Sequence, residues 1–264
     1  MELGLTGKRA IVTGGSRGIG LAIADSLAAE GAHVALIARN TDELARAAEH
    51  VGRHATRVVP VSTDTRDDDA VRAMVDRVAG VFGGVDILVN AAAEPAFAAP
   101  PPLAELTDDA LRAEIETKVL GYLRCIRAVV PHMIAAGWGR VVNIAGLAAR
   151  RTGALVGTVR NVSVAGMTKN LADELGPSGI TVNVVHPGLT VTERVAKAVA
   201  DRAASEGKST ADVIAAMARD VSIGRLVTSA ELAEVVTFLV SERSAAINGE
   251  SIDAGGGEKG VIHY

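Results

Sequence analysis

The stretch TGGSRGIG, residues 13–20, constrains the fold more than any other feature of the sequence. It follows the apolar run RAIVT and precedes LAIADSLAAEG, which has the pattern of a helix. A strand–glycine loop–helix unit exposes backbone N–H groups and the positive end of a helix, and both attract phosphate oxygens. The stretch therefore predicts a loop that holds the pyrophosphate of a dinucleotide, and a glycine turn without a ligand is the alternative. The loop residues expected at the dinucleotide are Gly14, Ser16, Arg17, Gly18, Ile19 and Gly20.

Short β-branched runs alternate with segments of helical length along the whole chain. These runs are RAIVT, HVALIA, RVVPVS, DILVN, RVVNIA, TVNVVH and ESIDA. The alternation is typical of βαβ units and a parallel sheet. We predict an α/β fold, a Rossmann-type doubly wound parallel sheet of about seven strands with helices on both faces, as one domain over residues 1–264. A charged, irregular stretch at 193–220 interrupts the pattern, and we expect it to form a substrate lid.

Composition excludes several classes of partner. Hydrophobic residues make up 48% of the chain but aromatic residues only 2%, which suits an aliphatic core and not a base-stacking surface. The net charge is −4 and the Lys and Arg residues are scattered, so we expect no nucleic acid and no membrane as partner. The acids Asp67, Asp68 and Asp69 suit the first turn of a helix better than a cation site, and we expect no metal.

The cellular compartment is inferred from cysteine usage and apolar runs. The single cysteine, Cys125, excludes an intramolecular disulfide framework and is interpreted as a small buried hydrophobe. We find no leader pattern at the N-terminus and no apolar run near the roughly 18 residues that span a bilayer. These features predict a cytoplasmic protein.

The end of the second predicted strand, HVALIARN, indicates which dinucleotide binds. A site for NAD usually places an acid here to bond the ribose hydroxyls, whereas this chain has Ala38 followed by Arg39. Arg39 and Arg17 can pair with a 2′-phosphate. The pattern therefore favours NADP, with NAD as the alternative. If neither arginine contacts a ligand, both are solvated surface residues.

Several motifs together resemble the short-chain dehydrogenase/reductase family, essentially from end to end. They are TGGSRGIG, Asp64 after the third run, NAAA at 90–93, HPGLTVT at 186–192 and the closing segment IGRLVTSAELAEVVTFLVSERSAAINGESIDAGGG. The resemblance implies a small-molecule substrate, and a homodimer or homotetramer that pairs through helices at about 107–136 and 155–176. NAAA departs from the family's usual NNAG. The further cofactor contacts that the resemblance implies are Asp64 and Thr65 at the adenine, Asn90, Ala91 and Ala92 along the cofactor, and Pro187, Gly188, Leu189 and Thr192 at the nicotinamide carboxamide.

The family's catalytic Ser, Tyr-x-x-x-Lys pair and Asn are not found at the matching positions. The segment SVAGMTKNLADELGPSGITVNVVHPG matches the family helix without a gap, which puts Gly157 at the Tyr and Asn161 at the Lys. Ala145 or Gly146 stands at the Ser, and Lys118 at the Asn. Lys118 and Asn161 are complementary replacements, and our hypothesis is that an ammonium and an amide have exchanged helices across one cavity. The alternative is an exposed Lys118 paired with Glu114.

No residue stands out as the proton donor that would replace the tyrosine. His186 ends a strand at the carboxyl edge, where ligands bind, and is a candidate acid, although a residue before proline is also held by backbone geometry. Tyr122 is expected to pack, and Thr158 and Ser163 lack an adjacent base.

Two hypotheses follow for the function. The first is an oxidoreductase with a rearranged site that uses Lys118 and Asn161. The second is a dinucleotide-binding pseudoenzyme that acts as a sensor or assembly partner. Near this site Arg150, Arg151 and Arg160 would hold an anionic group of the substrate, or are solvated loop residues.

Overall fold

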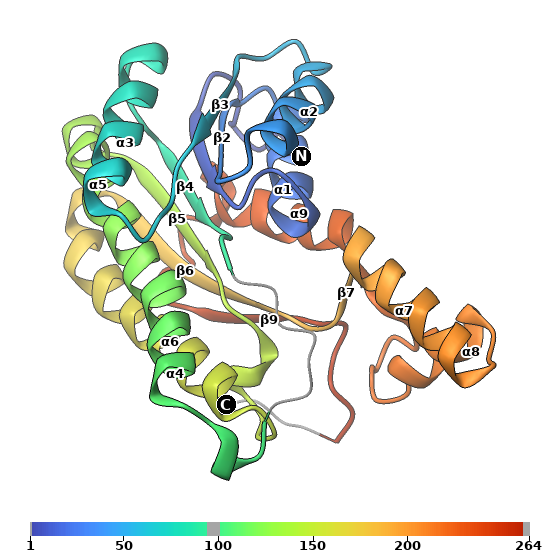
Figure 1. Ribbon diagram of the computed structural model, residues 1–264. Helices are drawn as coiled ribbons and strands as arrows, with labels where there is room; N and C mark the ends of the chain where they lie inside the picture. The colour runs from blue at the N-terminus through green and yellow to red at the C-terminus, as the bar shows by residue number, and fades with distance from the viewer. Residues whose placement is uncertain (1, 94–100, 261–264) are drawn as a thin grey trace.

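Seven parallel strands form the central sheet of the computed structural model, which describes residues 2–93 and 101–260. The strand order is β3-β2-β1-β4-β5-β6-β9, so the direction of winding reverses between β1 and β4 (Figure 1). The predicted Rossmann-type α/β fold is confirmed. In such sheets, ligands bind at the carboxyl ends of the strands beside the reversal. The strands are β1 Arg9–Thr13, β2 His33–Ala38, β3 Val58–Ser62, β4 Ile87–Asn90, β5 Gly139–Ile144, β6 Ile180–Pro187 and β9 Ser251–Ala254.

Helices cover both faces of the sheet (Figure 1). One face carries α1 (Gly18–Ala29), α2 (Thr41–Gly52) and α9 (Ser229–Leu239), which pack on a core of aliphatic side chains. The other face carries α3 (Asp68–Phe82), α5 (Gly121–Ala136) and α6 (Leu155–Leu175) on a second core. Short 3₁₀ turns at Leu103–Glu105, Leu147–Ala149, Gly176–Ser178 and Glu242–Ser244 join these elements.

The helix predicted at about 107–136 contains a widened turn. It runs as α4 (Asp108–Glu114), a π-helical segment (Ile115–Leu120) and α5. Single π turns inside α-helices are rare, and those that occur often lie at functional sites. By length and composition alone, the helical run Asp108–Ala136 could cross a membrane, since its most apolar window has a mean hydropathy of 1.3. This corrects our expectation that the sequence holds no apolar run of that length. In this structure the buried side chains of this run pack on α3 and the sheet, and 33% of the apolar window is buried.

The stretch at 193–220 is helical and not irregular as we expected. It forms α7 (Glu193–Glu206) and α8 (Thr210–Met217), which project from the carboxyl edge of the sheet (Figure 1). The helices pack on each other through a small apolar cluster that includes Val195, Val199 and Val213. The charged residues of α7 and α8 lie on the solvent-facing sides of the two helices. Because they stand between the apolar residues in the sequence, the helical period was not recognised. Two short strands, β7 (Thr190–Val191) and β8 (Val227–Thr228), pair at the base of this unit.

Candidate active site

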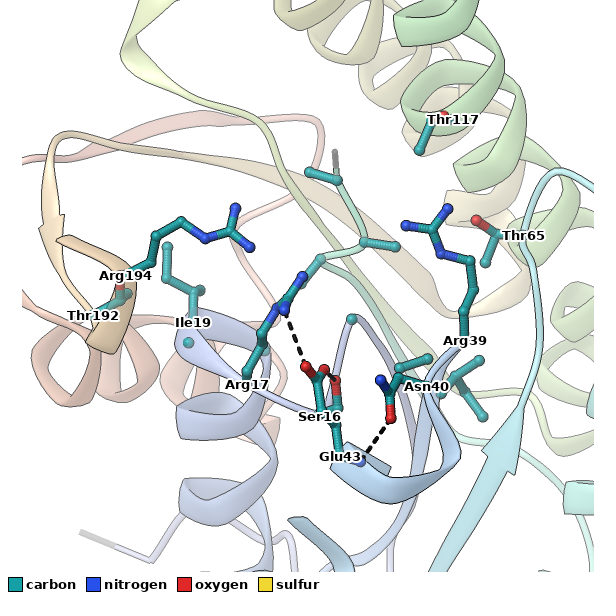
Figure 2. A pocket seen from close by; sticks show the side chains of 18 of the residues that line it. Ser16, Arg17, Ile19, Arg39, Asn40, Glu43, Thr65, Thr117, Thr192 and Arg194 are labelled. Carbon is teal, nitrogen blue, oxygen red and sulfur yellow. Dashed lines mark hydrogen bonds and ion pairs between the residues drawn. The ribbon is translucent and has the colours of Figure 1, made fainter. Parts of the chain in front are cut away.

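A cleft of about 810 Å³ lies at the carboxyl ends of β1, β2 and β4 (Figure 2). The cleft is lined by the glycine loop, by residues that follow β2, β3 and β4, and by residues at the start of α7. Most of the sequence-predicted cofactor residues meet in this cleft. Those that line it are Gly14, Ser16, Arg17, Gly18, Ile19, Gly20, Arg39, Asp64, Thr65, Ala91, Ala92 and Thr192.

The backbone of the glycine loop has the shape that a pyrophosphate needs. Gly14 has φ +67°, and a Cβ there would lie 2.9 Å from the carbonyl of Ala91. Gly18 has φ +55°, a conformation that L side chains rarely adopt. The start of α1 has no side-chain cap and no acid in its first turn, so its N–H groups are available to an anion. These residues therefore fit a dinucleotide phosphate.

Glu43 is a cleft residue that the sequence analysis missed. Its carboxylate accepts a hydrogen bond from Ser16 Oγ at 3.2 Å and pairs with Arg17 Nη1 at 3.2 Å. The signal was present in the sequence. Asn40 caps α2 by accepting from the N–H groups of Asp42 and Glu43, and this capping places Glu43 beside the end of β2.

A second cavity of about 390 Å³ adjoins the cleft, because Ile19, Ala91 and Ala93 line both. Two of the three predicted catalytic residues, Lys118 and Asn161, meet here with Pro187, Gly188 and Leu189, three of the four residues predicted to contact the nicotinamide. Three of its side chains are cationic, and the rest of the wall is largely apolar. The lining includes Lys118, Asn161, Arg160, Arg151, Ala145, Gly146, Leu147, Ala148, Pro187, Gly188 and Leu189.

Lys118 lies in the π-helical segment and is buried, with 4% of its surface exposed. Its ammonium donates a hydrogen bond to the carbonyl of Ala145 at 2.8 Å. The alternative of an exposed pair with Glu114 is wrong, because Glu114 forms its ion pair with Arg160 at 2.5 Å. Burial lowers the pKa of Lys118 to about 7; the charge of Arg160 adds to this effect and that of Glu114 opposes it. Lys118 can therefore change its protonation state near neutral pH.

Asn161 reaches the same cavity from α6 and is also buried. Its amide donates to the carbonyl of Gly146 at 3.3 Å, and Arg160 Nε donates to its side-chain oxygen at 3.3 Å. One turn earlier, Gly157 leaves space. A Cβ built there would lie 3.5 Å from Ala148 Cβ, which is an ordinary contact.

Comparison with known proteins identifies the family. The family model described as short chain dehydrogenase matches residues 8–203. A cis-4-hydroxycyclohexanecarboxylate dehydrogenase of Sinomonas cyclohexanicum is 36% identical over 258 residues, which cover 96% of each chain. The chain belongs to the short-chain dehydrogenase family. Membership places it among the NAD(P)-dependent oxidoreductases.

Two solved structures of oxidoreductases are also similar to this short-chain dehydrogenase. L-sorbose reductase from Gluconobacter frateurii, complexed with NADPH and L-sorbose, matches with a TM-score of 0.93 at 32% identity over 99% of this chain and 100% of that one. An NAD⁺-bound xylitol dehydrogenase matches with a TM-score of 0.86 at 27% identity over 96% and 99% of the two chains. The similar structures therefore include complexes with both dinucleotides.

Three candidates lie outside both cavities of this short-chain dehydrogenase. His186 is fully buried at the end of β6, with its ring nitrogens 3.0 Å from the Gly146 carbonyl and 2.7 Å from Ser251 Oγ. Burial lowers its pKa, and because the ring is buried and lines neither cavity, the structure does not support the predicted role of His186 as catalytic acid. The side chain of Asn90 points across the sheet and donates to Asn143 at 3.0 Å, so only the residues that follow Asn90 reach the cleft. Tyr122 packs in the core, with its hydroxyl on the Ile144 carbonyl at 3.0 Å.

The three arginines near the site differ in position. Arg150 pairs with Asp253 at 3.4 Å and does not line either cavity. Arg151 pairs with Glu258 at 3.2 Å and lines the second cavity. Arg151, Arg160 and Lys118 thus bring three cationic side chains to that cavity, and each of the two arginines is paired with a carboxylate. Cys125 is buried, and burial raises the pKa of its thiol to about 12, which fits a packing role.

The pKa of Lys118 predicts a pH-dependent difference in stability. Because its folded pKa of about 7 lies below the unfolded value, the burial penalty is complete below pH 7 and is relieved as the pH rises above it. Between pH 7 and pH 9, the wild type should therefore gain about 2 to 3 kcal/mol of unfolding free energy relative to Lys118→Met. Urea denaturation at both pH values measures this difference. The exposed Lys169→Met variant is the control, and parallel pH profiles for wild type and Lys118→Met would contradict the shift.

Proposed function

We propose that this short-chain dehydrogenase is an NADP(H)-dependent oxidoreductase in which Lys118 and Asn161 take the place of the family's Asn and Lys. The observation that carries the proposal is the buried Lys118 in a cavity that adjoins the glycine-loop cleft. A lysine is costly to bury, and a buried ionisable group with a perturbed pKa in a cavity marks a candidate functional site. Gly157 then stands where the family has Tyr, and Ala145 or Gly146 stands where it has Ser.

The cleft residues would hold the dinucleotide in the following way. The loop from Gly14 to Gly20 and the start of α1 would bind the pyrophosphate, because these residues line the cleft and the helix start has no side-chain cap. Arg39 and Arg17 would attract the 2′-phosphate of NADP(H). Asp64 and Thr65 would lie at the adenine, while Pro187, Gly188 and Leu189 border the second cavity, where the nicotinamide end belongs.

Lys118 is the group that would move the proton. The bound nicotinamide would supply the hydride to a carbonyl carbon or take it from an alcohol. During reduction, the Lys118 ammonium would give a proton to the carbonyl oxygen, and the neutral amine would take one back during oxidation. Asn161 and the Ala145 carbonyl would hold the polar groups of the cavity in place. The charge of Arg160 helps to keep the pKa of Lys118 near neutrality, where it serves both directions.

The second cavity indicates a substrate with an apolar body and an anionic group. Its apolar wall includes Leu147 and Leu189, and Lys118, Arg151 and Arg160 supply positive charge. A relative at 36% identity is a dehydrogenase of cis-4-hydroxycyclohexanecarboxylate, an alcohol of that chemical type. We therefore propose small cyclic or aliphatic hydroxy and keto carboxylates as substrates.

Assembly through helices is part of the proposal. The exposed face of α6 presents Leu155, Val159 and Val162, and these apolar side chains suit pairing with a second copy. A homodimer or homotetramer would bury this face.

Turnover with a carbonyl panel tests the proposal. NADPH oxidation is followed by loss of its absorbance with keto carboxylates and with the matching uncharged ketones. We expect turnover with some ketones and faster turnover with the carboxylates. Saturable NADPH binding without loss of absorbance across the panel would instead support the pseudoenzyme hypothesis, which the absent tyrosine favours.

Restoring the family arrangement should raise activity. The triple variant is Lys118→Asn, Gly157→Tyr, Asn161→Lys. It removes the buried Lys118 ammonium, whose charge would repel a lysine at 161, and a Cβ at Gly157 makes only ordinary contacts. Its kcat for ketone reduction should exceed that of the matched variant with Gly157→Phe by about 10²-fold, because only the phenol carries a proton. Equal rates for the Tyr and Phe versions would show that our alignment of the helix is wrong.

A further inference from the structure

Glu43 is an acid in a cleft whose other charged groups suit phosphate. Its carboxylate contacts both Arg17 and Ser16, each at 3.2 Å, and its side chain is 27% exposed. Figure 2 shows Glu43, Ser16 and Arg17 together at one side of the cleft, with Arg39 entering from the end of β2. The region that would meet the adenosine ribose therefore holds charges of both signs.

The two nicotinamide dinucleotides differ only at this ribose. NAD(H) carries a 2′-hydroxyl, which donates a hydrogen bond to a carboxylate. NADP(H) carries a 2′-phosphate, which a nearby carboxylate repels and a guanidinium attracts. Glu43 and the two arginines therefore favour opposite forms of the coenzyme.

We propose that Glu43 sets the balance between the two dinucleotides. It weakens binding of the phosphorylated form by placing a negative charge beside the phosphate position and by holding Arg17 in an ion pair. It assists the unphosphorylated form by offering an acceptor to the ribose hydroxyl. This inference rests on the proposed binding of a dinucleotide in the cleft and adds a determinant that opposes Arg39 and Arg17. The chain then binds both forms, with a restrained preference for NADP(H).

Charge removal at Glu43 tests this role in the folded protein. The dissociation constants of NADPH and NADH are measured by calorimetry for the wild type and for Glu43→Gln, which keeps the shape of the side chain. The matched control is Asp42→Asn, which removes the same charge from the same first helical turn. Asp42 is exposed and does not line the cleft.

We expect Glu43→Gln to raise the preference for NADPH over NADH by about five- to tenfold, and Asp42→Asn to change it by less than about twofold. Glu43→Lys should move the preference further in the same direction. An unchanged ratio in Glu43→Gln, or an equal change in both variants, would overturn the role of Glu43 and leave the proposed function standing. Binding of neither dinucleotide to the wild type would overturn both.

Discussion

Lys118→Met is expected to lower kcat for carbonyl reduction by about 10²- to 10⁴-fold, the usual contribution of a positioned general acid. NADPH affinity should change far less than kcat, because Lys118 does not line the cleft that would hold the pyrophosphate and the adenosine. Steady-state kinetics and an NADPH titration of the same preparation separate the two effects. A variant that retains wild-type kcat would remove Lys118 from the mechanism.

The pH profile distinguishes proton transfer from charge alone. In the wild type, kcat/KM for reduction should fall as the pH rises above about 7, because the Lys118 ammonium is lost, while the oxidation rate should rise. The charges that face Lys118 are those of Arg160 and Glu114, with His186 nearby on β6. Lys118→Arg keeps a positive charge that does not titrate in this range. It should remain slow and show no such limb, whereas a fast Lys118→Arg enzyme would assign only an electrostatic role to the ammonium.

Gly20→Ala should weaken NADPH binding by about 100-fold or more, which corresponds to the loss of one or two charge-assisted hydrogen bonds. A Cβ at this position would lie 2.2 Å from the carbonyl oxygen of Gly14, so the loop that forms the phosphate cradle must move. Calorimetry measures the loss of binding.

A matched glycine variant shows whether the effect is local. Gly52 ends α2, and a Cβ there meets nothing within 4 Å, so Gly52→Ala should bind NADPH like the wild type. Circular dichroism of both variants verifies that the fold is retained. Wild-type affinity in a folded Gly20→Ala would contradict the placement of the dinucleotide at this loop.

The fold could be predicted because its signals are local. The strands are short runs rich in aliphatic residues between turns, and the glycine loop lies between β1 and α1, the context in which a dinucleotide loop is expected. The helices α7 and α8 were missed because their polar faces dominate a short sequence window. Their apolar residues are recognisable only when the two helices pack together.

The site was predictable in its outline but not in its contacts. The motif positions brought Lys118 and Asn161 into one cavity, yet the sequence could not show that Glu114 pairs with Arg160 across two helices. His186 stood at the correct edge of the sheet, but its side chain direction depends on the contact with Ser251 on β9. Glu43 lies in the cleft because the Asn40 side chain caps α2, and this cap fixes the position of the first helical turn. Side-chain direction and long-range pairing are set by the assembled fold.

Transfer of a labelled hydride tests the central claim most directly. The wild-type protein is mixed with NADPH that carries deuterium at the transferable position of the nicotinamide and with a keto carboxylate, and the product is examined by mass spectrometry. Our account predicts a hydroxy acid with one deuterium on the carbinol carbon, and loss of this product in Lys118→Met. Absence of deuterium from every acceptor, with the dinucleotide bound, would contradict it.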